Sequence, residues 1–316
     1  MNALEITLTI FGSLAVLILA GAFICFLKVF YIPKRKPLPD GEYDIPPGRA
    51  YEEFRDDMVR WQKQLREMKC ERFEIQSHDG LTLRGKYYEY EKGAPLEIMF
   101  HGYQGNADRD LSGGVERCFT LKRNTIIIDQ RAHGASDGHV TTFGYKEKLD
   151  CLRWIDFAVK RFGPEQKIII TGVSMGAATV LLTAGENLPD NVVSALADCP
   201  YSSTREIICK IVREMKLPVK IIYPLIRLGA IIFGGFDPNK SEPQDAVKHA
   251  TIPIIFVHGD IDSFVPLYMS EKMYEICPTE KAIYVSPGAE HGLAFPKNQE
   301  GYYKAVGDFE KVWKKG

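Results

Sequence analysis

The chain has 316 residues, of which 45% are hydrophobic and 26% are charged, and its formal net charge is −1. This length and composition suit a globular protein with one large α/β core or two smaller ones. The near-neutral charge, without a basic stripe interleaved with aromatic residues, argues against nucleic acid as a partner.

The first predicted element is a helix from Ile6 to Leu27, a segment without a charged residue. At 1.5 Å per residue it would be about 33 Å long, enough to cross the hydrocarbon core of a bilayer. Lys28, Lys34, Arg35 and Lys36 follow it, so the positive-inside rule predicts a single-pass membrane protein with its large domain in the cytoplasm. A cleaved signal peptide is the alternative, but it would need a basic start and a shorter apolar core.

Residues 1–32 are thus the predicted anchor, and residues 50–316 the predicted domain. Between them, residues 33–49 contain five prolines and two glycines and are expected to form a linker that lifts the domain off the membrane. From Tyr51 to Met68, apolar residues recur at steps of three and four, which predicts an amphipathic helix. We expect it to pack on the domain, because its polar face mixes acids and bases.

Strands and helices are predicted to alternate through the rest of the domain. Period-two patterns on both sides of His78-Asp79-Gly80 predict an antiparallel hairpin of residues 73–77 and 81–88. Beyond it, short apolar runs alternate with helical stretches, which predicts a mixed, mostly parallel sheet flanked by helices. The expected strands are residues 96–100, 125–129, 167–171, 193–197, 253–258 and 282–286, and the expected helices are residues 145–161, 175–187, 267–276 and 298–313.

The stretch from Tyr201 to Ala250 interrupts this alternation. It is too long for a loop, rich in isoleucine, and contains Pro218 and Pro224. We therefore predict a small helical cap inserted between two strands. Its isoleucines favour a hydrophobic or acyl substrate, although they would equally form the core of the cap itself.

The segment from Lys167 to Ala178 combines a β-branched strand, a sharp turn and the start of a helix. At the turn, the sequence Gly172-Val173-Ser174-Met175-Gly176 places a serine between two glycines. This pattern is typical of a nucleophile elbow, in which Ser174 is held in strained geometry where the strand turns into the helix. The N-terminus of that helix offers free N–H groups where an oxyanion would form.

Four motifs follow one another along the chain: His101-Gly102-Tyr103-Gln104-Gly105-Asn106, then Gly172–Gly176, then His258–Pro266, then Glu290-His291-Gly292. In these motifs the chain, from Phe73 to its C-terminus, resembles the α/β-hydrolase superfamily, specifically its serine hydrolases of the esterase, thioesterase and serine-aminopeptidase kind. The resemblance implies the α/β-hydrolase fold, with an N-terminal antiparallel hairpin, helices on both faces of a mostly parallel sheet and a small helical cap. It also implies that the catalytic residues follow the order Ser, Asp, His.

Ser174, Asp262 and His291 are the candidate catalytic residues. A serine hydroxyl is a weak nucleophile and needs a base, and His291 lies just past the last predicted strand. Asp262 matches the acid of the family's D-x-x-V-P segment and would hold the imidazole in the correct tautomer. Asp260 remains the alternative acid.

Two backbone N–H groups, those of Tyr103 and Met175, are the candidate donors for the oxyanion. The Met175 amide follows from the elbow, and the Tyr103 amide from the glycine-bearing loop after the strand 96–100. His101 and His258 each end a strand before a glycine and are expected to shape loops. Residues 129–136 resemble the family's D-x-R-G-x-G-x-S loop, with Ala132 where the family has glycine.

No phosphate-binding loop, G-x-G-x-x-G motif or metal-ligand cluster is present in the sequence, so we expect no cofactor and no metal. The seven cysteines are scattered and never spaced C-x-x-C, which predicts reduced thiols. The expected reaction is a two-step acyl transfer on an ester, thioester or amide, with water as acceptor. An acyltransferase with the same residues, and a non-catalytic hydrolase fold that serves as a scaffold, are the alternatives.

Overall fold

The computed structural model describes residues 2–34, 38–39 and 41–314 of the chain; Arg35 and Lys36, two of the cations used above to predict orientation, lie outside them. Within this part, eight strands form one sheet in the order β1-β2-β4-β3-β5-β6-β7-β8. Strands β1 and β2, and β2 and β4, pair antiparallel, whereas all other neighbours pair parallel. The predicted hairpin and mostly parallel sheet are therefore confirmed. The strands are β1 (Glu71–Gln76), β2 (Thr82–Tyr88), β3 (Leu96–Phe100), β4 (Asn124–Asp129), β5 (Ile168–Val173), β6 (Val192–Asp198), β7 (Ile254–Gly259) and β8 (Lys281–Ser286).

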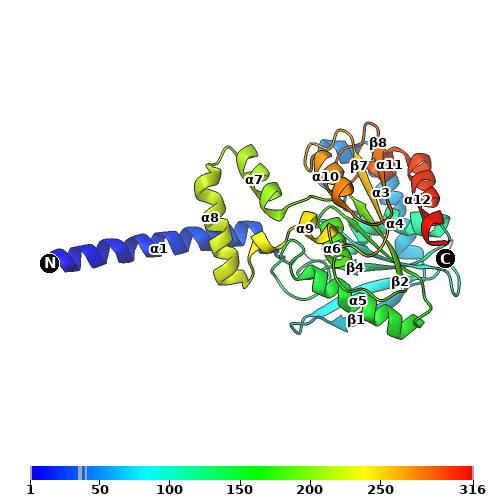
Figure 1. Cartoon of the computed structure of the whole chain (residues 1–316), viewed down its shortest axis with the longest axis horizontal. Coiled ribbons are helices and arrows are strands. Elements are labelled where there is room, and N and C mark those ends of the chain that lie inside the picture. The colour runs from blue at the N-terminus through cyan, green and yellow to red at the C-terminus, as the bar shows by residue number, and fades with distance from the viewer. Residues whose placement is uncertain (1, 35–37, 40, 315–316) are drawn as a thin grey trace.

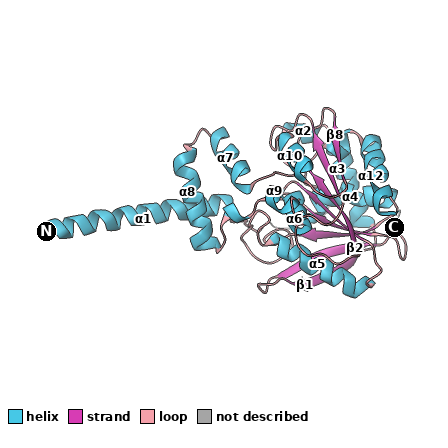
Figure 2. Cartoon of the chain, in the orientation of Figure 1, coloured by secondary structure: helices cyan, strands magenta, loops and turns pink. Residues whose placement is uncertain are grey.

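Helices cover both faces of this sheet (Figures 1 and 2). Alternate residues of a strand point to opposite faces, so Ile98 and Ile126 join one buried core while Met99 and Ile127 join another. The first core is closed by α5 (Glu147–Phe162), α6 (Met175–Ala184) and α10 (Tyr268–Ile276). The opposite face is covered by α3 (Arg55–Glu67), α4 (Ala107–Thr120) and α12 (Gln299–Lys314).

Two helical elements differ from the sequence-based prediction. Helix α4 was not predicted at all, and the helix expected from Tyr51 to Met68 is divided at Phe54 into α2 (Arg49–Glu52) and α3. The division lets α2 turn toward the C-terminal half of the sheet, where a four-residue helix, α11 (Ala294–Lys297), precedes α12.

Between β6 and β7 the chain forms helices, as predicted for the cap. They are α7 (Thr204–Glu214), α8 (Val219–Gly229), the π-helical turn η1 (Ala230–Gly234), the 3-10 turn η2 (Pro238–Lys240) and α9 (Pro243–Val247). We use "cap" for α7, α8 and η1. Ile207 and Ile208 of α7 and Ile226 of α8 pack with Met175 and Phe143 in one buried cluster.

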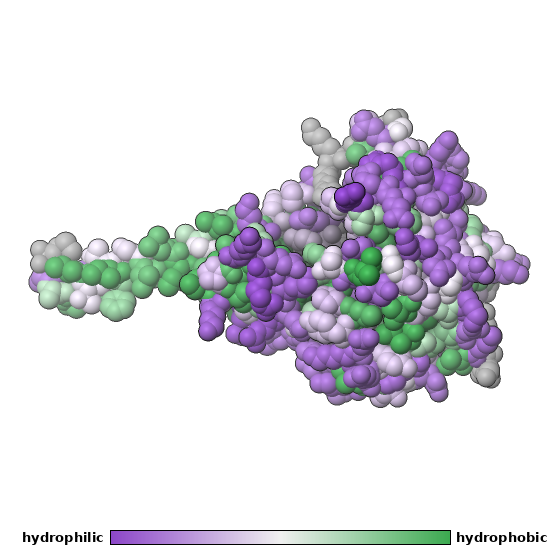
Figure 3. All heavy atoms as spheres, turned by 90° about the horizontal axis from the view of Figure 1, so that it is seen from above, coloured by the Kyte–Doolittle hydropathy of each residue, from purple (hydrophilic) through white to green (hydrophobic). Residues whose placement is uncertain are grey.

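The N-terminal helix α1 (Ala3–Val29) projects away from the domain as a long rod (Figure 1). It is the one helix in the described part of the chain that is by itself long and apolar enough to span a membrane. Hydrophobic side chains cover its surface as far as the domain (Figure 3).

The junction between α1 and the domain contradicts our expectation of a spacer. Phe30 and Ile32 are buried in the domain, and their backbone bonds to the loop before α5, from Ile32 N to His139 O at 2.8 Å and from Thr141 N to Phe30 O at 2.9 Å. The cause is the aromatic end of α1, which packs into the cap cluster. The domain therefore lies directly against the end of α1.

Candidate active site

Ser174 lies at the turn between β5 and α6, in a backbone conformation that few residues other than glycine adopt, with φ of 55°. The two flanking glycines make this turn possible. A Cβ on Gly172 would lie 2.1 Å from the Gly176 backbone, and a Cβ on Gly176 would lie 2.1 Å from the Phe100 carbonyl oxygen. The strand and helix thus meet at a distance that excludes any side chain at either glycine, and the serine is held at the carboxyl edge of the sheet.

The structure brings Ser174, His291 and Asp262 together. The Ser174 hydroxyl lies 2.9 Å from His291 Nε2, and His291 Nδ1 lies 2.7 Å from Asp262 Oδ2. Because the Asp262 carboxylate can only accept, Nδ1 carries the proton and Nε2 is the acceptor for the Ser174 O–H. This is the tautomer that a general base at Nε2 requires.

Asp262 is buried and accepts backbone N–H bonds from Phe264 at 2.9 Å and Val265 at 2.7 Å. Burial alone would raise its pKa, but hydrogen bonds from His258 and His291 lower the pKa of Asp262 to about 2. It is therefore ionised throughout the neutral range. Asp260, the alternative acid, accepts instead from the Gly288 N–H at 2.6 Å.

His258 contacts Asp262, a role that the sequence motifs did not predict. Its Nε2 lies 2.8 Å from the Val265 carbonyl and 3.3 Å from Asp262 Oδ2. Both partners are acceptors, so Nε2 carries the proton and Nδ1 accepts from the Ser270 hydroxyl at 2.7 Å. His258 thus contacts the same carboxylate oxygen, Oδ2, that accepts from His291, and helps to hold the carboxylate in place. Tyr51 of α2 was also missed, and its hydroxyl donates to the His291 carbonyl at 2.9 Å.

The loop that carries Tyr103 runs beside the nucleophile, since a Cβ on Gly102 would lie 3.6 Å from Ser174 Cβ. Two buried histidines hold this loop. His101 Nε2 accepts the Gln130 N–H at 3.0 Å, and His133 Nε2 accepts the Gln104 N–H at 3.1 Å. Burial lowers the pKa of His101 and lowers that of His133 to about 4, so both remain neutral acceptors near pH 7.

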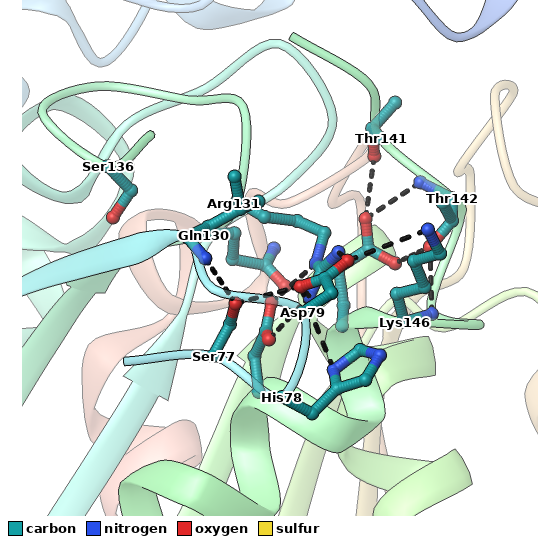
Figure 4. Close-up of polar contacts among 12 residues, drawn as sticks. Ser77, His78, Asp79, Gln130, Arg131, Ser136, Thr141, Thr142 and Lys146 are labelled. Carbon is teal, nitrogen blue, oxygen red and sulfur yellow. Dashed lines mark hydrogen bonds and ion pairs between the residues drawn. The ribbon is translucent and has the colours of Figure 1, made fainter. Parts of the chain in front are cut away.

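A buried ionic network supports the loop that contains His133 (Figure 4). Arg131 binds Asp150 through two hydrogen bonds of 2.6 Å and reaches Asp79 of the β1–β2 turn at 3.0 Å. These carboxylates raise the pKa of Arg131, against the effect of its burial. In the same loop Ala132, at the family's glycine position, has φ of 68°, which explains why glycine suits that position.

The end of α1 forms part of the same region. The Tyr103 hydroxyl donates to the Val29 carbonyl at 2.9 Å, and the Phe143 ring lies 5.2 Å from the Tyr103 ring and 5.6 Å from that of Phe30. The predicted anchor therefore contacts the residue whose amide is the candidate oxyanion donor.

Cys199, Asp262 and His291 place potential ligand atoms within 4.8 Å of one another, the one such group among the described residues. Asp262 and His291 already satisfy each other by a hydrogen bond. Burial raises the pKa of the Cys199 thiol, which disfavours the thiolate that a metal would need. The arrangement thus suits proton transfer to and from Ser174 better than it suits a metal ion.

Comparison with known proteins agrees with this geometry. A family model described as alpha/beta hydrolase fold matches residues 98–215, and one described as serine hydrolase (FSH1) matches residues 202–300. The chain is 29% identical over 238 residues to the uncharacterized protein YqkD of Bacillus subtilis, covering 75% of this chain and 78% of that protein. It is 24% identical over 205 residues to the lysophosphatidylserine lipase ABHD12 of Xenopus tropicalis, covering 60% of this chain and 48% of that protein.

Among solved structures, the esterase Pf2001 of Pyrococcus furiosus superposes with a TM-score of 0.63 at 21% identity, over 90% of this chain and 98% of that one. At this identity the likeness establishes the fold. Together with the sheet topology and the two family matches, it shows that the chain has the α/β-hydrolase fold, and the matches support a hydrolase similar to the serine hydrolases. The predicted fold class is confirmed.

Proposed function

We propose that the chain is a membrane-anchored serine hydrolase that cleaves an ester, thioester or amide through an acyl-Ser174 intermediate. The observation that carries the proposal is the continuous hydrogen-bond chain from the Ser174 hydroxyl through His291 to the ionised Asp262. It begins at a nucleophile held in strained geometry, the arrangement that activates a serine for acyl transfer.

In the proposed reaction, Ser174 Oγ attacks the substrate carbonyl carbon while His291 Nε2 takes the hydroxyl proton. Asp262 stabilises the imidazolium that forms, and the amides of Tyr103 and Met175 are the proposed donors to the oxyanion. As the bond to the leaving group breaks, His291 returns the proton to that group. Water then attacks the acyl-serine by the same route, which releases the acid and restores Ser174.

We propose a hydrophobic acyl group in the substrate. The residue after the nucleophile, Met175, packs with Tyr201, Ile207 and Val265 in an apolar cluster shared with the cap. The names of two similar proteins, a lysophosphatidylserine lipase and an esterase, support an ester in particular.

The anchoring rests on α1, whose most apolar 18-residue stretch is almost entirely exposed. A soluble protein rarely exposes such an apolar surface, because its transfer from water to an apolar medium is favourable. Lys28 and Lys34 lie on the domain side of the span, whereas Glu5 lies at its other end. This asymmetry supports a domain on the cytoplasmic side.

Ser174→Ala tests the nucleophile. We expect this variant to lose labelling by a fluorophosphonate probe and to lose hydrolysis of short p-nitrophenyl esters, because no other group on the elbow can form the acyl intermediate. Ser13→Ala, which makes the same change within α1, should keep both. Undiminished labelling of Ser174→Ala would exclude Ser174 as the nucleophile.

A further inference from the structure

The cap exposes large apolar side chains beside the anchor. Ile221 of α8 is 61% exposed, and in the η1 turn Ile231, Ile232 and Phe233 are 44%, 49% and 40% exposed. Isolated apolar residues are common on protein surfaces. These four, however, lie on two consecutive elements that both contact α1. They therefore extend the apolar surface of the rod onto the domain.

Two contacts show where along α1 the cap packs against this helix. Helix α8 approaches so closely that a Cβ on Gly229 would lie 2.3 Å from the Ala22 carbonyl oxygen. The ring of Phe233 lies 5.0 Å from that of Phe23. Phe23 precedes Lys28 by five residues, or about 7.5 Å of helix, so the contact lies within the uncharged span.

The length of α1 places this contact relative to the bilayer. The hydrocarbon core is about 30 Å thick, which corresponds to about 20 helical residues. Counted from Glu5, whose charge must stay at the far surface, the core extends to about Cys25. The contact at Ala22 and Phe23 therefore falls inside the near edge of the hydrocarbon.

The orientation of α8 fits this position. Figure 1 shows α8 running across α1 rather than along it, so a membrane pierced by α1 would contain α8 roughly in its plane. Tyr223 and Ile226 bury one side of α8 in the domain, while Ile221 is exposed. Lys216 and Lys220, both exposed near the start of α8, can reach lipid phosphates while their stems stay in apolar surroundings.

We propose that the cap is a second membrane contact, in which Ile221 and the η1 residues Ile231, Ile232 and Phe233 insert among the acyl chains of the leaflet next to the domain. The proposal rests on the anchoring of α1 proposed above but not on catalysis. Exposed apolar area on the cap and the depth of its contact with α1 both point to lipid as the occupant.

Tryptophan fluorescence of the full chain in phosphatidylcholine vesicles with brominated acyl chains tests the proposal. Bromine quenches only indoles that it can touch, and the wild-type protein supplies the background of its three native tryptophans. We expect Ile232→Trp to lose emission to an extent comparable to Leu17→Trp, which probes the middle of α1. Tyr90→Trp is the matched control, because Tyr90 is also an exposed apolar residue but lies at the edge of the sheet opposite Ser174; it should keep its emission.

Each other outcome overturns the proposal in a distinguishable way. Quenched Leu17→Trp with unquenched Ile232→Trp would leave the anchor intact and exclude the cap from the lipid. An unquenched but blue-shifted Ile232→Trp would indicate that protein, such as a second copy of the chain, covers the cap. If Leu17→Trp also escaped quenching, α1 would not be inserted, and both the anchor and the cap contact would be wrong. Labelling of Ser174 is measured separately and is independent of all three results.

Discussion

At the end of β7, two carboxylates two residues apart have different partners. Asp262 accepts from His291, whereas Asp260 accepts only from the Gly288 amide in the contacts described. Gly259 packs so closely on Ala289 that a Cβ on Gly259 would lie 2.0 Å from the Ala289 carbonyl oxygen. The chain turns at this contact, and the side chains of Asp260 and Asp262 then reach different partners. The two acids offer a matched pair of variants.

We expect Asp262→Asn to lower kcat by about a thousandfold or more with little change in KM. The amide keeps the size of the acid but can stabilise the wrong histidine tautomer, and only the transition state depends on that tautomer. Asp260→Asn should change kcat little. Both variants are measured on one ester substrate, and an inactive Asp260→Asn beside an active Asp262→Asn would assign the acid to Asp260.

A second buried acid, Asp198, lies below the elbow and makes the stability depend on pH. Its Oδ2 accepts from the Tyr302 hydroxyl at 3.2 Å, while its Oδ1 has no hydrogen-bond partner in the described structure. Burial raises the pKa of Asp198 to about 6. The folded state therefore holds this proton more tightly than the unfolded state, so the free energy of unfolding falls as pH rises from about 4 to about 6.

We expect Asp198→Asn to remove this decrease in the free energy of unfolding with rising pH. The amide carbonyl can still accept from Tyr302 but carries no charge, so the variant should be more stable than the wild type by on the order of 2 kcal/mol at pH 8, with a much smaller difference at pH 4. Thermal unfolding at the two pH values measures it. Equal shifts in Tm at both pH values would show that Asp198 is not the titrating group.

The motif order let the sequence predict the residues that meet at the site, because each motif specifies a local turn whose geometry is set by its own glycines. It did not predict His258 as a support of Asp262, or Tyr51 as a support of His291. Tyr51 reaches His291 across 240 positions of the chain, and no local pattern encodes that contact. The sequence placed His258 at a strand end but gave no indication of the direction of its ring.

At the scale of helices and strands, the strands were predicted almost to the residue because β-branched runs bounded by turn residues are strong local signals. Helix α4 was missed because Gly113 and Gly114 lie at its centre, and glycine disfavours helix by about 1 kcal/mol per residue. Tertiary packing explains both glycines. A Cβ on Gly113 would lie 2.7 Å from the Trp61 ring, and one on Gly114 would lie 2.8 Å from Met99 Sδ.

The crossing of α1 and α8 gives a prediction at the same scale. Gly229→Ala would place a methyl group 2.3 Å from the Ala22 carbonyl oxygen, so the helices must separate. We expect a loss of about 1–3 kcal/mol, as for other overpacked contacts. Thermal unfolding of the full chain in detergent, followed by circular dichroism, measures the change.

Gly307→Ala is the control for that measurement. Gly307 lies within α12, and a Cβ there would meet no atom within 4 Å. The same substitution should therefore stabilise the protein by up to about 1 kcal/mol, the difference in helix propensity between alanine and glycine. Changes of the same sign and size at both positions would show that the contact between α1 and α8 does not matter.

For the whole molecule, the sequence predicted a membrane helix followed by a hydrolase domain, but not the arrangement of the two. Proline content suggested a spacer, whereas the aromatic side chains Phe26 and Phe30 at the end of α1 are buried in the cap cluster. Such a contact depends on which surface the cap presents. For the cap, the sequence indicated an apolar composition but did not predict which of its residues face α1.

The expected topology follows from the charges around α1. Protease added to intact cells should leave the domain whole, because Lys28 and Lys34 favour the cytoplasmic side. The protein should also stay with the membrane after an alkaline wash, since an inserted helix is held by its apolar area rather than by charge. Digestion from outside would reverse the orientation, and release by alkali would exclude insertion.

The Tyr103 hydroxyl donates to the Val29 carbonyl at the end of α1, so the loop beside Ser174 is bonded directly to this helix. Many anchored domains hang on a flexible tether and can sample the solution around them, because the reach of a tether grows with its length. If α1 spans the bilayer as proposed, this contact sets the height of Ser174 above the membrane. The anchored protein would then cleave only those substrate bonds that lie at this fixed distance from the membrane surface.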